Sequence, residues 1–496
     1  MESESLGDLI SHTLHHRSDE RALEHLGKWY SWSEVQEAAS TVTTLLDCAG
    51  IGRGTPVGLV ARNRPAHIAS LLSLVLSQRC AGMIYSAQSP ESMAADISRA
   101  NFGTIIADIE DWTPAMKVAA CKAGCFAIAL GGNDPMSVQV MTDVEANTGK
   151  ARPTVTDDIA LYILSSGTTG PPKRIPIKSS SLAFSLRDGI KGAQQQNTGS
   201  ADEAPYILHA PLGNITGVQY TLRGAVEGRP SVLMEKFAVN EWVDNIQKYR
   251  PSLAFLPPAG LRMVFDASIS REALASIKTI RMGGAPLDPA LQEQFEDRYG
   301  IPILLTYGAT EFSGVIVAWT RDDYDRFGRS KRGSVGRARP GVQLRLIADA
   351  SSGSEIGTLE ALVPWVSDEW IRTTDLASID EDGFVFLHGR TDQVINRGGF
   401  KITPSCIVDA LLRHPAIADA VVISVKEARL GEVPVAAVEL RAAAEPPTER
   451  DLMEFVRRTL LAYQIPSRII VLDSLPRTPS LKVSLAKVRE LIPAHT

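Results

Sequence analysis

The chain has 496 residues, of which 44% are hydrophobic and 22% charged, and its formal net charge is −6. A chain of this length exceeds one ordinary hydrophobic core, so two or more domains are expected, and the lack of a basic block excludes a typical nucleic-acid-binding surface. No apolar run reaches the roughly 18 residues that a membrane span requires. The acidic start, Met-Glu-Ser-Glu-Ser, is unlike a signal peptide, and the scattered cysteines argue against a disulfide framework, so a cytoplasmic location is expected.

Helix and strand patterns alternate over the first part of the chain. Ser33 to Cys48 predicts a helix, with a serine at the N-cap and apolar residues on one face, and Pro65 to Gln78 predicts a second helix. Between them, Pro56 to Val60 has the apolar character of a short buried strand. Two similar strands are expected at Gly103 to Ala107 and at Phe126 to Leu130. Strands that alternate with helices in this way indicate parallel βαβ units.

The pattern changes twice in the rest of the chain. Lys191 to Pro205 is polar and rich in Gln, Gly and Ser, which predicts a surface loop. Ile207 to Gly341 returns to α/β alternation, and Val342 to Val363 predicts β-hairpins. From about Thr391 a small α+β domain is expected. Its predicted elements are a short helix at Ile407 to Leu412, strands at Ala418 to Val425 and Val433 to Leu440, and a helix at Glu449 to Leu461.

The densest polar motif follows an apolar strand pattern at Ile159 to Leu164. The nine residues SSGTTGPPK comprise Ser165, Ser166, Gly167, Thr168, Thr169, Gly170, two prolines and Lys173. Glycines let backbone N–H groups approach phosphate oxygens, hydroxyls donate hydrogen bonds and lysine supplies a positive charge. The loop therefore predicts phosphate binding, although it differs from the GxxxxGK[ST] pattern.

SSGTTGPPK closely resembles the signature loop of the adenylate-forming superfamily, which comprises acyl- and aryl-CoA ligases, luciferases and the adenylation domains of peptide synthetases. Further motifs resemble that superfamily in the same order along nearly the whole chain: RMGGAPL from Arg281, YGATE from Tyr307, TTD from Thr373, NRGGFKI from Asn396 and LPRTPSLKV from Leu475. The resemblance implies an α/β fold with a large N-terminal domain, residues 1–390, made of βαβ sheets plus a small β-barrel-like part. It also implies a small, mobile C-terminal α+β domain, residues 391–496.

The same resemblance implies roles for individual residues. The expected ATP-binding residues are Ser165, Ser166, Gly167, Thr168, Thr169 and Lys173 around the phosphates, Gly283, Gly284, Ala285, Tyr307 and Gly308 around adenine, and Asp375 and Arg390 at the ribose. Thr310 is expected to contact the α-phosphate, Glu311 to bind Mg²⁺ and Lys482 to catalyse adenylation. Asp392 is the expected hinge between the domains. The acid pocket is expected near Asn214, Gly217, Gly283, Gly308, Phe312, Ser313 and Gly314.

The implied reaction explains why such groups are needed. A carboxylate is a poor electrophile, and its attack on the α-phosphate of ATP gives an acyl-adenylate and pyrophosphate. Two anions must meet, so Lys482 and Mg²⁺ offset their charge, and no protein nucleophile is required. We therefore expect an ATP-dependent, AMP-forming ligase for a carboxylic acid, aromatic or otherwise bulky, with CoA as the default acceptor.

Several positions depart from the superfamily's pattern. Leu481 stands where a glycine usually precedes the catalytic lysine, and Thr374 replaces the glycine of TGD. Ser405 to Val408 lacks two usual glutamates, Leu485 replaces an arginine, and Gly213 and Asn214 replace an aromatic–His pair. The adenylation groups are thus retained, while the C-terminal surface that meets the acceptor has changed.

These departures leave the acceptor open. The alternative to CoA is a free amine, which would make the protein an amide bond synthetase, with Asp202 or Glu203 as a candidate base. A stand-alone enzyme that loads a separate carrier protein also remains open. The loss of aromatic bulk at Gly213 would suit a wide or polycyclic acid. A non-catalytic nucleotide-binding regulator is the remote alternative, and a monomer or homodimer is expected.

Overall fold

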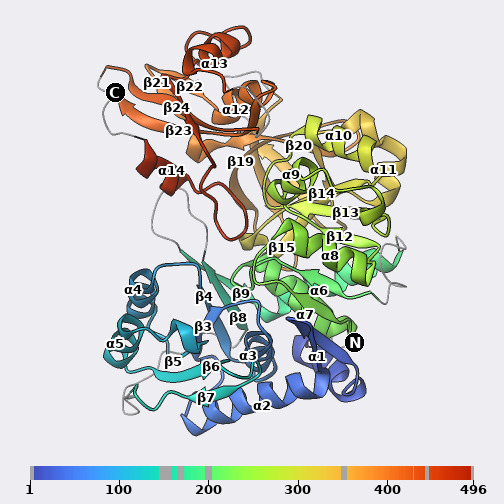
Figure 1. Ribbon diagram of the computed structural model, residues 1–496, viewed down its shortest axis with the longest axis vertical. Helices are drawn as coiled ribbons and strands as arrows, with labels where there is room; N and C mark the ends of the chain where they lie inside the picture. The colour runs from blue at the N-terminus through green and yellow to red at the C-terminus, as the bar shows by residue number, and fades with distance from the viewer. Residues whose placement is uncertain are drawn as a thin grey trace.

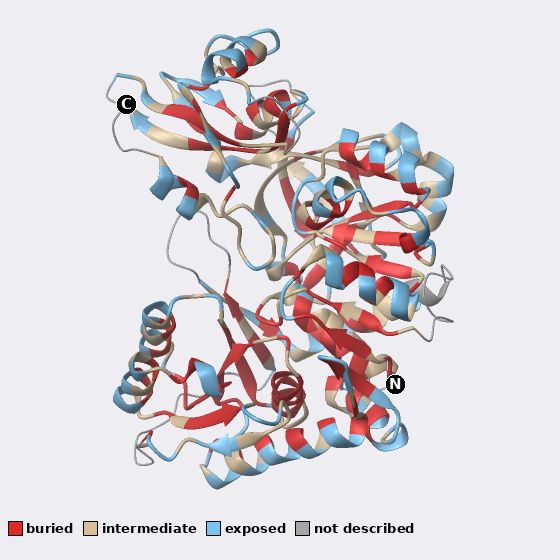
Figure 2. Ribbon diagram, in the orientation of Figure 1, coloured by how far each residue is buried: buried red, intermediate tan, exposed pale blue. Residues whose placement is uncertain are grey.

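The computed structural model describes residues 5–144, 158–164, 173–195, 204–347, 355–427, 429–441 and 446–492. Figure 1 shows a large N-terminal part, coloured from blue to yellow, and a small orange and red C-terminal part at the top. Both parts combine helices with sheets, which confirms the predicted α/β class. Figure 2 shows that the strands are largely buried, whereas the outer faces of the helices are exposed.

A seven-stranded sheet begins the N-terminal part. Its order is β7-β6-β5-β3-β4-β8-β9, and the pairings from β6 to β8 are parallel. The strands are β3 (Pro56–Ala61), β4 (Cys80–Tyr85), β5 (Thr104–Asp108), β6 (Phe126–Leu130), β7 (Val138–Val140), β8 (Ile159–Leu164) and β9 (Arg174–Lys178). Ile106 packs into a core with α2 (Trp32–Cys48) and α3 (Pro65–Leu76), whereas Ile105 packs into a core with α4 (Pro90–Ala100) and α5 (Pro114–Ala123). The predicted βαβ units are therefore present, with helices on both faces.

A nine-stranded sheet follows, in the order β12-β13-β14-β15-β16-β20-β19-β18-β17. Its strands are β12 (Leu253–Phe255), β13 (Thr279–Gly283), β14 (Ile303–Ala309), β15 (Gly314–Ala318), β16 (Ser334–Ala338), β17 (Gln343–Ile347), β18 (Gly357–Leu362), β19 (Ile371–Ile379) and β20 (Phe384–Arg390). The first three strands are parallel and the others antiparallel. The antiparallel strands, expected as a small barrel-like part, thus continue the parallel strands in one sheet. The helices α8 (Val239–Tyr249), α9 (Pro258–Asp266) and α10 (Pro289–Tyr299) share a hydrophobic core with β12 to β14.

A four-stranded sheet, β10-β11-β1-β2, completes the N-terminal part. Its strands are β1 (Arg21–His25), β2 (Lys28–Ser31), β10 (Tyr206–Leu208) and β11 (Ser231–Leu233). The remaining helices of this part are α1 (Leu6–His16), α6 (Ser179–Gln195), α7 (Ile215–Glu227) and α11 (Arg321–Phe327), with 3-10 turns η1 (Ile109–Asp111), η2 (Glu272–Leu274), η3 (Thr310–Phe312) and η4 (Gly328–Lys331). Among the described residues, no helix combines the length and apolar character needed to cross a membrane.

The C-terminal part is a five-stranded sheet with helices on both faces. Its elements are η5 (Thr391–Gln393), β21 (Ile395–Arg397), β22 (Phe400–Ile402), α12 (Pro404–Leu412), β23 (Ile417–Glu427), β24 (Gly431–Leu440), α13 (Glu449–Val456), β25 (Arg468–Leu472) and α14 (Leu485–Leu491). Val422 packs into the core with α12 and α13, whereas Val421 packs into the core with Val488 of α14. This is the small α+β domain that the sequence predicts.

Several predicted boundaries are wrong, including those of three helices. The N-cap of α2 is Ser31, not Ser33, because its hydroxyl accepts the Glu34 N–H while the Glu34 carboxylate accepts the Ser31 N–H. The helix α6 extends to Gln195, so the first residues of the expected loop after Lys191 are helical. The helix α13 ends at Val456, where the chain tightens into i to i+3 hydrogen bonds.

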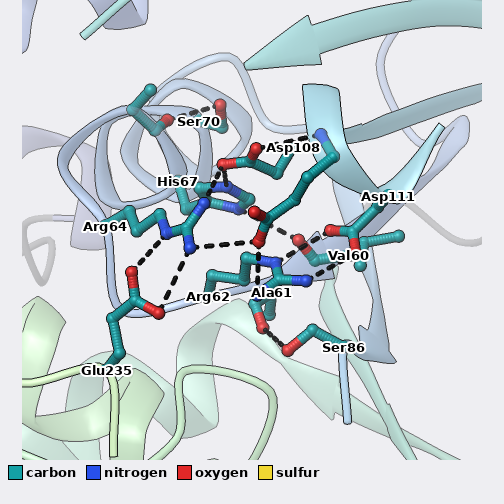
Figure 3. A network of polar contacts seen from close by, with 12 residues as sticks. Val60, Ala61, Arg62, Arg64, His67, Ser70, Ser86, Asp108, Asp111 and Glu235 are labelled. Atoms are coloured by element: carbon teal, nitrogen blue, oxygen red, sulfur yellow. Dashed lines mark hydrogen bonds and ion pairs between the residues drawn. The ribbon is translucent and has the colours of Figure 1, made fainter. Parts of the chain in front are cut away.

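A network of charged groups around the buried Asp108 joins the start of α3, the end of β5 and the chain that follows β11 (Figure 3). Arg64 donates to Asp108 at 2.8 Å and to Glu235 at 2.5 Å. His67 Nε2 lies 3.3 Å from the same Asp108 carboxylate. Burial acts to raise the pKa of Asp108, but the hydrogen bonds from His67 and Arg64 outweigh it, so the pKa is lowered. The network therefore ties the seven-stranded sheet to the four-stranded one by charge-assisted hydrogen bonds.

We expect Arg64→Ala to lower the free energy of unfolding by about 3 kcal/mol, because it removes the guanidinium that pairs with the buried Asp108 carboxylate. Because the pKa of Asp108 is lower in the folded protein than in the unfolded chain, its ionised carboxylate stabilises the fold when the pH is above the unfolded-state pKa. This stabilisation is lost as the pH falls toward the folded-state pKa. The difference between wild type and variant should therefore shrink as the pH falls below about 4. Urea denaturation measures both effects.

The matched control is Arg450→Ala, which removes an exposed ion pair with Glu454 (Nε–Oε1 3.2 Å) on α13. This variant should change the free energy of unfolding by less than about 0.5 kcal/mol. Equal losses in the two variants would contradict the structural role of the buried network.

Candidate active site

The carboxyl ends of β13 and β14 bring two of the predicted motifs together. These strands are parallel neighbours, with Gly283 paired to Thr306, so the residues that follow them leave the sheet at the same edge. A Cβ on Gly283 would lie 2.4 Å from Thr306 Oγ1, and one on Gly308 would lie 2.1 Å from Gly314 O. Both positions therefore require glycine for close backbone packing. In open α/β sheets this edge is the usual place for ligands.

A chain of polar contacts runs from Tyr307 across the antiparallel strands. The Tyr307 hydroxyl donates to Asp375 Oδ2 at 2.5 Å, although the two residues are 68 positions apart. Burial, followed by the neighbouring Asp375 carboxylate, raises the pKa of the Tyr307 phenol. Asp375 and Arg390 are register partners on β19 and β20, and their side chains lie 3.5 Å apart (Oδ1–Nη1). The structure thus brings three predicted ATP-binding residues into one contiguous group.

Arg390 also binds the predicted hinge residue. Its guanidinium donates to both carboxylate oxygens of Asp392, with Nε and Nη2 each at 2.9 Å. This hydrogen bonding, opposed by burial and helped by the charge of Asp375, raises the pKa of Arg390. Asp392 lies in η5, between the last strand of the nine-stranded sheet and the first strand of the C-terminal sheet. One guanidinium therefore contacts both the predicted hinge residue and the predicted ribose-binding carboxylate.

Lys482 reaches the edge of β13 from the C-terminal domain. A Cβ on Gly284 would lie 3.6 Å from Lys482 Cε, which is ordinary van der Waals contact. Lys482 is exposed, although its side chain approaches Gly284 and is partly desolvated by nearby protein atoms. This desolvation, followed by the positive charge of Arg390, lowers the pKa of Lys482. The Lys482 ammonium group thus lies beside Gly284 and within electrostatic range of Arg390.

The loop after η3 is held by a residue that sequence analysis did not identify. Ser313 has a left-handed φ of +56° and Gly314 a φ of +135°. Gln219 of α7 donates from Nε2 to Ser313 O at 2.6 Å, and a Cβ on Gly314 would lie 2.2 Å from that same Nε2. Phe312 is 1% exposed, and its carbonyl accepts the Trp365 indole N–H. Nothing in the sequence pattern links Gln219 to this loop, because the contact joins residues 94 positions apart.

Asn214 and Gly217 have clear structural reasons for their identities. Asn214 is the N-cap of α7, and its Oδ1 accepts the Gly217 N–H at 2.9 Å. A Cβ on Gly217 would lie 2.1 Å from Pro211 O, so only glycine fits. A Cβ on Gly213 would lie 3.3 Å from the Tyr85 ring, so Tyr85 fills much of the space that a larger residue would occupy. The expected widening of the acid pocket at Gly213 therefore finds no open space on that side.

The remaining predicted residues divide into three groups. Thr310 is partly buried in η3, while Glu311 and Ala285 are exposed close to the same strand ends. Lys173 is exposed directly before β9. Two sets of predicted residues lie outside the described part of the chain: Ser165, Ser166, Gly167, Thr168 and Thr169 of the signature loop, and the candidate bases Asp202 and Glu203.

Comparisons with known proteins identify the family of the chain. The family described as AMP-binding enzyme matches residues 10–360, and the AMP-binding enzyme C-terminal domain matches residues 408–482. 4-coumarate–CoA ligase 3 of Oryza sativa subsp. japonica is 26% identical, over 94% of this chain and 88% of that protein.

Two solved structures share the fold. ATP-bound MatB from Rhodopseudomonas palustris has a TM-score of 0.83 at 21% identity, covering 98% of this chain and 99% of that one. O-succinylbenzoate CoA synthetase from Bacillus subtilis, in complex with its acyl-adenylate intermediate, has a TM-score of 0.78 at 21% identity, covering 97% of each chain. With one family matching most of its length and a second matching its C-terminal domain, the chain belongs to the AMP-binding enzymes.

Proposed function

We propose that the protein is an AMP-forming acid–CoA ligase, which adenylates a carboxylic acid with ATP and then transfers the acyl group to CoA. The observation that carries the proposal is the approach of Lys482 to Gly284, where Lys482 also lies within electrostatic range of Arg390, the ion-pair partner of Asp375. A nucleotide needs a carboxylate for its ribose hydroxyls and a cation for its phosphates. These groups come from separate domains and meet at one sheet edge.

In the first half-reaction, an oxygen of the acid's carboxylate attacks the α-phosphorus of ATP, and the bond from that phosphorus to the pyrophosphate oxygen breaks. Asp375 accepts hydrogen bonds from the ribose hydroxyls, and the Tyr307 ring contacts adenine beside Gly283 and Gly284. The Lys482 ammonium stabilises the negative charge that develops on the α-phosphate. Positioning and charge compensation thus supply the catalysis.

Glu311 is the proposed Mg²⁺ ligand, and the neighbouring Thr310 is proposed to contact the α-phosphate. Mg²⁺ prefers oxygen ligands, keeps several waters and is commonly bound by one or two carboxylates together with substrate phosphates. Among the described residues no cluster of three or more potential metal ligands occurs. The single exposed carboxylate of Glu311 fits a Mg²⁺ ion whose other ligands are water and substrate phosphates. When bound, the ion would offset phosphate charge.

Two further assignments belong to this proposal. The acid is aromatic or otherwise bulky, in keeping with relatives named for 4-coumarate and o-succinylbenzoate, and it lies near Phe312, Ser313 and Gly314. The domains comprise residues 1–390 and 391–496, with Asp392 as the hinge. The bidentate contact between Arg390 and Asp392 supports this hinge, because a backbone rotation at Asp392 would move the Arg390 guanidinium, which belongs to the proposed nucleotide site.

The first test is acid-dependent release of pyrophosphate by the full chain with ATP and Mg²⁺. The panel would contain 4-coumarate, o-succinylbenzoate, oxalate and a series of fatty acids. We expect release with at least one aromatic or bulky acid and none without acid. Absence of release across the panel would favour a non-catalytic nucleotide-binding protein and contradict the proposal.

The second test offers the acyl-adenylate to CoA and to a set of primary amines in parallel. A thioester is the expected product. Amide formation without thioester would overturn the assignment of CoA and establish the alternative, an amide bond synthetase. That alternative is motivated by the loss of the usual glutamates at Ser405 to Val408, where the Ser405 hydroxyl instead donates to His388 O at 2.8 Å.

A further inference from the structure

The loop that carries Lys482 is a tight hairpin whose base is fixed within the C-terminal domain. Arg477 and Val483 form a β-bridge, and the Arg477 guanidinium donates to Asp419 of β23 at 2.6 Å. The N–H of Leu475 donates to Glu439 of β24 at 2.9 Å. The base of the loop therefore moves with the C-terminal sheet.

The tip of this hairpin is a three-residue turn with an unusual residue at its last position. Thr478 N–H donates to Lys482 O at 2.7 Å, and Leu481 N–H donates to Thr478 O at 2.8 Å. Hairpins of this kind place their third loop residue in the left-handed region, where glycine is favoured. Leu481 occupies it with a φ of +62°. A leucine is strained in this conformation, so the backbone alone would favour glycine here.

The Leu481 side chain offers a compensating contact in the other domain. It packs against the hydrophobic core that α8 to α10 form with β12 to β14, and Leu287, which follows the Gly283–Gly284 loop, packs against the same core. The next residue is Lys482, whose Cε is in contact range of Gly284. The left-handed turn at Leu481 thus places an apolar side chain against this core and the ammonium beside Gly284, both in the N-terminal domain.

We propose that Leu481 is a positioning residue that anchors the Lys482 hairpin on the N-terminal domain and so favours the domain arrangement used for adenylation. This inference rests on the proposed function of Lys482. The anchor acts only while the C-terminal domain faces the strand ends of β13 and β14. It should therefore assist the first half-reaction and have no role in transfer from a finished adenylate.

The decisive variant is Leu481→Gly, because it relieves the backbone strain while removing the anchor. We expect the rate of acid-dependent pyrophosphate release to fall on the order of tenfold, through a smaller population of the docked arrangement. Transfer from supplied acyl-adenylate should be unchanged or faster. Asparagine is polar and adopts the left-handed region more readily than leucine, so Leu481→Asn should behave like the glycine variant. Leu481→Met keeps a large apolar side chain and should retain most of the wild-type rate of pyrophosphate release.

Two outcomes would overturn the proposal. A glycine variant that adenylates at least as fast as wild type would mean that strain, not anchoring, is the main effect of Leu481. Equal losses in both half-reactions would indicate a general structural role. The matched control is Arg441→Ala, which removes a different inter-domain contact, the ion pair with Asp266 (Nη1–Oδ1 3.9 Å), and should leave both half-reactions within about twofold of wild type.

A readout without catalysis keeps this inference separate from the proposed function. Tryptic cleavage after Lys482 should be severalfold faster in Leu481→Gly than in wild type, because the undocked hairpin exposes that bond. If cleavage is faster but wild type itself releases no pyrophosphate with any acid, the anchor stands and the proposed function fails. If Leu481→Gly is cleaved at the wild-type rate and wild type releases pyrophosphate with an acid, the anchoring role of Leu481 is rejected while the proposed function stands.

Discussion

Lys482→Ala should lower the rate of acid-dependent pyrophosphate release by about 10²- to 10³-fold, the usual cost of removing one preorganised charge or donor from a transition state. The physical reason is that the acid's carboxylate and the α-phosphate are both anionic, and Lys482 is the cation that the C-terminal domain brings to Gly284. Transfer from supplied acyl-adenylate should remain within about threefold of wild type, because this charge acts only before the adenylate exists.

The pH dependence gives a second measurement on the same residue. Desolvation and the charge of Arg390 lower the pKa of Lys482 from its ordinary value of 10.5. Since the charged form is required, pyrophosphate release should fall as the pH rises through that lowered value, before an unperturbed lysine would lose its proton. A rate that stays constant up to the ordinary lysine pKa would contradict the role given to Lys482.

The control is Lys487→Ala, which removes another lysine five positions along the chain. Lys487 is exposed on α14, where its backbone N–H donates to Ser484 Oγ at 3.5 Å. This variant should react at the wild-type rate in both half-reactions. A loss comparable to that of Lys482→Ala would point to general disturbance of the C-terminal segment.

Local patterns predicted the elements of the fold well, because strand and helix periodicity depends on neighbouring residues. The parallel strands from Pro56 onward and the small C-terminal domain both follow from such patterns. Helix ends were less predictable. The sequence contains serines at both 31 and 33, and the capping box that selects Ser31 depends on the backbone entering the helix at that residue.

The candidate site was predictable as a set of residues but not as a set of contacts. Motifs identified Tyr307, Asp375 and Arg390 one by one, but the hydrogen bond from Tyr307 to Asp375 joins distant parts of the chain and leaves no local signal. Leu481 was visible in the sequence as a departure from glycine. Its left-handed backbone and its packing on the other domain depend on tertiary structure.

Asp375→Ala should lower kcat/KM for ATP by roughly 100-fold, because a carboxylate that accepts two ribose hydroxyls contributes two hydrogen bonds to a charged group. The substitution also leaves the buried Tyr307 hydroxyl without its acceptor. Tyr307→Phe separates the two effects, since it removes the same phenol–carboxylate contact but keeps the carboxylate. Tyr307→Phe should lower kcat/KM for ATP by less than about fivefold. Equal losses would mean that Asp375 serves mainly to hold Tyr307.

A comparison of ATP with 2′-deoxy-ATP identifies the ribose contact itself. Wild type should use the deoxynucleotide less efficiently, because one hydrogen bond to Asp375 is missing. In Asp375→Ala that difference should disappear, since the variant has no carboxylate for either nucleotide to bind. Discrimination that persists in the variant would place the ribose elsewhere. Arg390 would then be explained by its ion pairs with Asp375 and Asp392, as part of the proposed hinge and not of the nucleotide site.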